Sequence, residues 1–183
     1  MNNWRKNFLG AYLLYLLIYG SISLRMGLHW DEVLDFDGSA YDTYIAAGRW
    51  LTGFIRALSG SCESPWCPGF VSGLILCSLI CQQAQMLNLH DAWKRWAFII
   101  LYLGSVQWAS MLHFSFLVES LTLGMFFATA AAWLSHCKKG WKSGLLAAFL
   151  LALAIGAYQT LAMYFGVAWL LLRLLELRRH PEG

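Results

Sequence analysis

The sequence predicts an all-α protein that crosses a membrane several times, and three observations support this fold class. Of the 183 residues, 59% are hydrophobic and 13% are charged, whereas soluble domains average about 25% charged residues. A soluble fold of this length has too little interior to bury so much apolar surface. Uncharged apolar runs recur along the chain, with Lys and Arg between them. The composition therefore excludes a soluble domain, a disordered chain and a coiled coil, and we expect no nucleic-acid partner.

The uncharged apolar runs predict five or six membrane spans. Four are separate runs, at about Phe8–Leu24, Phe70–Leu89, Trp96–Leu112 and Ser120–Leu134. The last run, Ser143–Leu172, would form a helix of about 45 Å at 1.5 Å per residue, whereas a hydrocarbon core is about 30 Å thick. Either it forms one tilted helix, or it forms two short helices that meet near residues 156–160.

The positions of the basic residues favour six spans. If the N-terminus is cytoplasmic and the last run crosses twice, ten of the 13 Lys and Arg fall on the cytoplasmic side. The positive-inside rule therefore predicts a multi-pass membrane protein with both termini in the cytoplasm. These ten residues are Arg5, Lys6, Lys94, Arg95, Lys138, Lys139, Lys142, Arg173, Arg178 and Arg179.

The beginning of the chain also fits a second interpretation. Arg5 and Lys6 precede an apolar run, and Ser21-Ile22-Ser23 loosely matches a small-x-small cleavage site. These are the parts of a cleaved signal peptide. The apolar run is long for that purpose, and further spans follow, so we favour a first span that is retained.

The one long hydrophilic stretch, Arg25–Pro68, follows the first predicted span and is expected on the periplasmic side. It holds six of the ten acidic residues, clustered towards its start. Either these acids solvate an outer loop, or they belong to a site at the membrane surface. Cys62 and Cys67, within this loop, could close a small disulfide in an oxidising periplasm.

The second half of this loop is predicted to form an amphipathic helix on the membrane surface, over Tyr44–Leu58. Its apolar residues recur at helical spacing, with Arg49, Thr52 and Arg56 on the opposite side. Two arginines seven residues apart nearly eclipse one another, so they either bind a lipid phosphate or anchor the helix by snorkelling.

Two polar features lie at membrane depth, where ionisable and polar residues often have a function. Glu119 lies at the outer end of the fourth span, and Tyr158-Gln159 lies at the expected turn of the long run. The alternative is a carboxylate that reaches the interface and a turn that satisfies freed backbone groups. Both features and the loop acids converge on the outer face, where we expect a cavity with carboxylates at its rim.

These residues give the chain a resemblance to a known family. Four motifs occur in the same order as the motifs of a transferase family. They are Asp31-Glu32, Gly48-Arg49-Trp50, the stretch 114–121 that contains Glu119, and Tyr158-Gln159. The sequence resembles the bacterial and phage O-antigen glucosyltransferases often called glucosyltransferase II, which are polytopic enzymes of the GT-C class. The order of the motifs extends over nearly the whole chain, although Val33-Leu34-Asp35 stands where the family often carries an Arg.

The resemblance implies an enzyme that transfers a sugar, glucose by the family name, from a polyprenyl phosphate to a glycan acceptor such as O-antigen lipopolysaccharide. It implies a location in the bacterial inner membrane. It also implies Asp31 as the general base, Glu32 either as its partner or as a substrate ligand, and Arg49 as the ligand of the donor phosphate. A divalent metal bound by the loop acids is the alternative to Arg49, and the sequence does not decide between them. The remaining residues expected to bind substrate are Asp35, Glu119, Tyr158 and Gln159.

We expect residues 1–183 to form a single transmembrane domain. Because family members are about twice as long, we expect this domain to be the N-terminal part of a longer transferase. A non-catalytic membrane protein, either a truncated remnant or a subunit of a lipid-linked-sugar flippase, is the alternative. The acidic pair and the Tyr-Gln dipeptide speak against that alternative. A solute transporter is a weaker interpretation, because no span carries a charge near its middle.

Overall fold

The computed structural model describes residues 2–24, 40–59, 66–112, 115–137 and 140–179. Every regular element in these ranges is a helix, which confirms the all-α class. The described helices are α1 (Asn2–Ser23), α3 (Ala40–Ala46), α4 (Trp50–Ser59), α5 (Trp66–Met86), α6 (Ala92–Leu103), α7 (Val106–Met111), α8 (Ser115–Cys137), α9 (Trp141–Ala157) and α10 (Leu161–Arg179).

Two of the described helices are long and apolar enough to cross a bilayer. They contain the segments Gly69–Met86 of α5 and Val118–Cys137 of α8, and α9 is a shorter apolar helix of 17 residues. Their length and composition support membrane association. The number of crossings stays a prediction.

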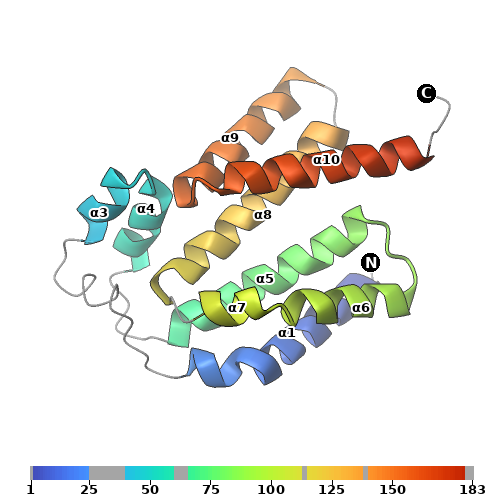
Figure 1. The fold of residues 1–183 in the computed structure, drawn as a ribbon, viewed down its shortest axis with the longest axis horizontal. Coiled ribbons are helices and arrows are strands. Elements are labelled where there is room, and N and C mark those ends of the chain that lie inside the picture. The colour runs from blue at the N-terminus through green and yellow to red at the C-terminus, as the bar shows by residue number, and fades with distance from the viewer. Residues whose placement is uncertain (1, 25–39, 60–65, 113–114, 138–139, 180–183) are drawn as a thin grey trace.

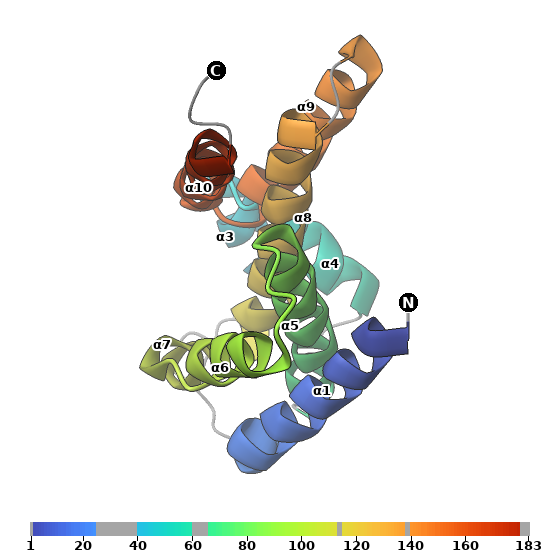
Figure 2. The same ribbon diagram turned by 90° about the vertical axis from the view of Figure 1, so that its right-hand side faces the viewer.

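The long helices α5 and α8 form the centre of the bundle. Figure 2 shows α1 and the α6–α7 pair diverging on one side of them, and α9 and α10 on the other. Helix α8 packs against α5, α9 and α10, and α1 packs against α5. One apolar core lies between α1, α5, α6 and the beginning of α8, and a second lies between α4, α8, α9 and α10.

The first core depends on close approach between α1 and α5. Tyr15 is fully buried, and its hydroxyl donates a hydrogen bond of 2.8 Å to the carbonyl of Gly69. Its ring lies against Gly73, where an added Cβ would collide with the ring atoms. Small residues at such positions allow helices to approach closely, which favours their association inside a membrane. The buried thiols of Cys77 and Cys81 belong to the same helix α5.

The apolar run Trp96–Leu112 does not form the single helix expected there. It is divided into α6 and α7 by Gly104 and by Ser105, whose backbone is extended. The hydroxyl of Tyr19 in α1 donates to the carbonyl of Leu103 and, at 3.4 Å, to that of Ser105. A side chain of a neighbouring helix therefore hydrogen-bonds to backbone carbonyls at the interruption.

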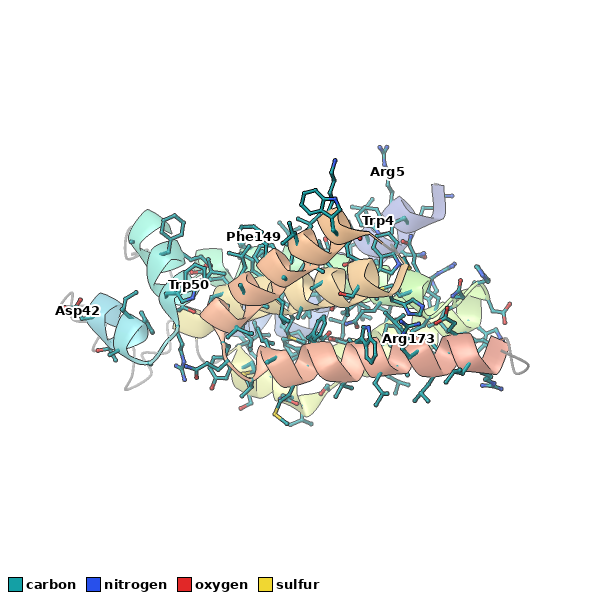
Figure 3. The ribbon with its side chains drawn as sticks, turned by 90° about the horizontal axis from the view of Figure 1, so that it is seen from above. Trp4, Arg5, Asp42, Trp50, Phe149 and Arg173 are labelled. Atoms are coloured by element: carbon teal, nitrogen blue, oxygen red, sulfur yellow. The ribbon has the colours of Figure 1, made fainter. Side chains whose placement is uncertain are left out.

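The long run Ser143–Leu172 forms two helices, as the second alternative predicted. Helix α9 ends at Ala157, Tyr158 is extended, and α10 begins at Leu161. The α9–α10 turn lies at the same end of the bundle as α3 and α4 (Figure 1). The end of α5, the beginning of α6, the end of α8 and the beginning of α9 lie towards the opposite end, with the beginning of α1 and the end of α10 (Figure 1). Figure 3 shows Arg5 and Arg173 far from Asp42 and Trp50 along the bundle.

A polar cluster joins α5, α8 and α10. The amide of Gln83 donates to the hydroxyl of Tyr164 and, at 3.4 Å, to that of Thr129, and the two hydroxyl oxygens lie 3.3 Å apart. Hydrogen bonds between helices in a membrane are worth about 0.6 kcal/mol on average, because the unfolded helices also find partners. The cluster therefore has a modest role in fixing how α10 sits on α5 and α8.

Replacing Gln83 by leucine should accordingly lower the free energy of unfolding by only about 0.6–1.7 kcal/mol. Unfolding in mixed micelles titrated with sodium dodecyl sulfate measures this change. Gln85→Leu is the matched control, because Gln85 is exposed on the same helix. A loss of more than about 3 kcal/mol would show that the cluster is essential to the fold.

Candidate functional site

The segment that connects α3 to α4 is a tight turn around Gly48. Gly48 has a φ of 72°, a left-handed conformation that L side chains rarely adopt. The amide of Arg49 donates to the carbonyl of Tyr44 at 2.8 Å, and that of Gly48 donates to Ile45 at 2.9 Å. The single amphipathic helix expected over Tyr44–Leu58 is therefore wrong. The helical spacing of apolar residues continues through the turn, so it cannot reveal that the backbone leaves the helical conformation there.

The turn is attached to the end of α9 by the side chain of Gln159. Its Nε2 donates a hydrogen bond of 2.6 Å to the carbonyl of Ala47, which is 112 residues away in the sequence. Gly48 lies directly beneath this amide, since an added Cβ would be 2.5 Å from Gln159 Nε2. The Gly-Arg element and the Tyr-Gln dipeptide, which lie far apart in the sequence, therefore meet in the fold.

Arg49 is held against the neighbouring residue of the same dipeptide. Its Cζ lies 4.5 Å from the centroid of the Tyr158 ring, within the range of a cation–π interaction. Tyr158 presents its ring there because its backbone is extended, with φ −157° and ψ 123°, directly after the end of α9. Arg49 and Tyr158 are both partly exposed, so the pair lies at the surface of the bundle.

The first turn of α4 continues the contact along α9. The Trp50 ring lies over Gly156, where any Cβ would collide with it. The Thr52 hydroxyl donates to the carbonyl of Ala157 at 2.9 Å, and Thr52 is fully buried. The placement of Thr52 on the polar side of a surface helix is therefore wrong. This hydroxyl instead caps a carbonyl at the end of α9 that has no partner within its own helix.

These contacts make a defined structure, which we call the Gly-Arg socket: residues 47–52 packed on residues 156–159. Leu51 adds an apolar contact beneath it, in the core that includes Ala154, Ala157 and Leu161. The roles of Thr52 and Gly156 were not predicted from the sequence. A threonine and a glycine within helical segments can indicate close helix packing, but neither residue identifies the partner that it contacts.

Glu119 lies near the beginning of α8, at the end of the bundle where α4 packs. Glu119 is partly exposed, and its backbone carbonyl accepts a hydrogen bond of 3.0 Å from the Thr122 hydroxyl. The structure thus brings Arg49, Tyr158 and Gln159 together and places Glu119 at the same end.

The loop acids that are expected to act in the reaction lie outside the described residues. Asp31, Glu32 and Asp35 are among them, as is Cys62, and the side chains of Arg56 and Cys67 are likewise not described. The end of α1 and the beginning of α3, which flank the loop acids, lie at the same end of the bundle as the Gly-Arg socket (Figure 1). Within the described ranges, no three His, Cys, Asp or Glu side chains gather into a metal-binding group.

Comparison with known proteins identifies the family. No curated protein and no solved structure matches the chain. The family model described as glucosyl transferase GtrII matches residues 20–180, a range that contains the loop acids, the Gly-Arg socket and Glu119. Because this match covers most of the 183 residues, the chain belongs to the glucosyl transferase GtrII family.

Proposed function

We propose that this family member transfers a glucosyl group from a polyprenyl phosphate to a glycan acceptor, such as the O-antigen of lipopolysaccharide, at the periplasmic face of the inner membrane. The observation that supports the proposal best is the Gly-Arg socket, which fixes a guanidinium at one end of a helical bundle. The opposite end carries the Lys and Arg of α1, α6, α9 and α10. By the positive-inside rule that end would face the cytoplasm, so Arg49 would face the periplasm.

Arg49 is suited to the donor phosphate. A cation–π contact occupies no hydrogen-bond acceptor of the protein, and the five N–H donors of a guanidinium match phosphate oxygens in pairs. The C1–O bond of the donor breaks during transfer, and its electron pair leaves with the polyprenyl phosphate. A fixed positive charge at that oxygen is worth more in the transition state than in the ground state.

The acceptor hydroxyl needs a general base, because it is a weak nucleophile. In the proposed reaction Asp31 takes the hydroxyl proton while the acceptor oxygen forms its bond to C1, and Glu32 supports Asp31. Asp35 and Glu119 would hydrogen-bond the sugar or the acceptor. Where a divalent metal takes part, the loop acids Asp31, Glu32 and Asp35 would hold it, since carboxylate oxygens are its preferred ligands.

The test measures glucose on surface glycans of cells that express the gene in its natural context. Asp31→Asn and Arg49→Ala should each reduce glucosylation about 100-fold, because one removes the base and the other the phosphate ligand. Asp42→Asn is the matched control, since Asp42 is an exposed acid of the same loop region with no proposed role. Glucosylation at the wild-type level in both variants would refute the proposal and favour a non-catalytic membrane protein.

A further inference from the structure

We propose that Tyr158 and Gln159 are positioning residues, which orient Arg49 towards the donor phosphate instead of binding sugar. The inference rests on the proposed function, because it assumes that Arg49 meets the phosphate. It assigns to the dipeptide a different role from the lining of a substrate pocket. The role follows from what the two side chains already contact.

Both side chains already make contacts within the protein. In the structure Nε2 of Gln159 donates to Ala47, and the Arg49 guanidinium lies over the Tyr158 ring. These contacts exist before any substrate binds, so they give both side chains a role that needs no sugar.

The two contacts restrain the arginine in different ways. Gln159 holds the backbone of the turn, because it binds the carbonyl immediately before Gly48. Tyr158 holds the side chain itself, at the guanidinium. An Arg side chain otherwise samples many rotamers, and fixing it before the donor binds removes part of the entropy cost of binding.

The first experiment compares two substitutions of Tyr158 in donor titrations with membranes that contain the full-length protein. Tyr158→Leu should lower kcat/KM for the polyprenyl-phosphate donor about tenfold, with part of the loss in kcat, since the guanidinium that stabilises the leaving phosphate is no longer oriented. Tyr158→Phe should restore kcat/KM to within about twofold of the wild type, because the ring is kept. KM for the acceptor should not change in either variant. Equal kcat/KM values for the Phe and Leu variants would overturn the proposal, because the ring would then make no difference.

A double-mutant cycle asks whether Tyr158 acts through Arg49. In an Arg49→Ala background, Tyr158→Leu should have no further effect on kcat/KM for the donor, because the partner has already been removed. Effects of the two substitutions that multiply would overturn the positioning role. If Arg49→Ala alone leaves kcat/KM for the donor at the wild-type value, the proposed role of Arg49 fails, and that outcome is distinguishable from a failure of the positioning role.

The role of Gln159 is tested without any substrate. Hydrogen exchange of the full-length protein in nanodiscs should show at least about tenfold faster exchange of the Arg49 amide in Gln159→Ala, because the turn loses its attachment. Gln107→Ala is the matched control, since Gln107 is exposed on α7. Unchanged exchange at Arg49 in the Gln159 variant would overturn the contribution of Gln159 to positioning.

Discussion

Replacing Gly48 by valine is expected to destabilise the folded protein by roughly 3–5 kcal/mol and to remove transfer activity. Gly48 has a φ of 72°, which is strained for any L residue and most strained for a β-branched one. An added Cβ would also be 2.5 Å from Gln159 Nε2, so the hydrogen bond to Ala47 would be broken. Both effects act on the turn that holds Arg49.

Denaturant unfolding of the purified protein and glycan analysis of cells together check this expectation. Gly144→Val provides the matched control, because nothing lies within 4 Å of an added Cβ at that helical position. The control should change stability by less than about 0.5 kcal/mol. If the two valine variants unfold at the same denaturant concentration, then the conformation assigned to Gly48 is incorrect.

The second large effect is expected at Tyr15, with a loss of roughly 3–5 kcal/mol when it is replaced by alanine. Tyr15 is fully buried between α1 and α5, and the substitution would leave a cavity beside Gly73. Tyr15→Phe removes only the hydrogen bond to Gly69, and we expect it to cost about 0.5–1.5 kcal/mol.

The same helix supplies the comparison for Tyr15. Leu17 is 83% exposed, so its side chain makes few contacts within the bundle that a substitution could remove. Leu17→Ala should therefore change the free energy of unfolding by less than about 0.5 kcal/mol. Equal losses in Tyr15→Ala and Leu17→Ala, measured in the same micelles, would mean that α1 does not pack on α5 through Tyr15.

The sequence predicted the parts of the fold that depend on length and hydrophobicity. The long run Ser143–Leu172 was too long for one span, and it does divide, at Tyr158–Thr160. The interruption at Gly104 was not predicted, because the run Trp96–Leu112 carries no charge and predicts one continuous span. A hydroxyl from another helix bonds to the Leu103 carbonyl there, and hydrophobicity along one segment carries no information about that partner.

The candidate site was predictable as a set of residues but not as an arrangement. Arg49, Tyr158 and Gln159 were each expected to act, and the structure brings all three together. Thr52 was assigned to the wrong face, because a single hydrophobic period was carried through Gly48. Which carbonyl Thr52 or Gln159 binds is a tertiary contact, and periodicity describes only one helix at a time.

The Gly-Arg socket also has a consequence for the order in which the protein is assembled. Its two hydrogen bonds join residues that are separated by 105 and by 112 positions in the sequence. At synthesis rates of about 5–20 residues per second, α4 leaves the ribosome on the order of 5–20 s before the residues that hold it. During that interval Arg49 has no socket, because α9 has not yet been made. The orientation of the arginine is thus among the last of the described features to form, and it reports that the turn between α9 and α10 is in place.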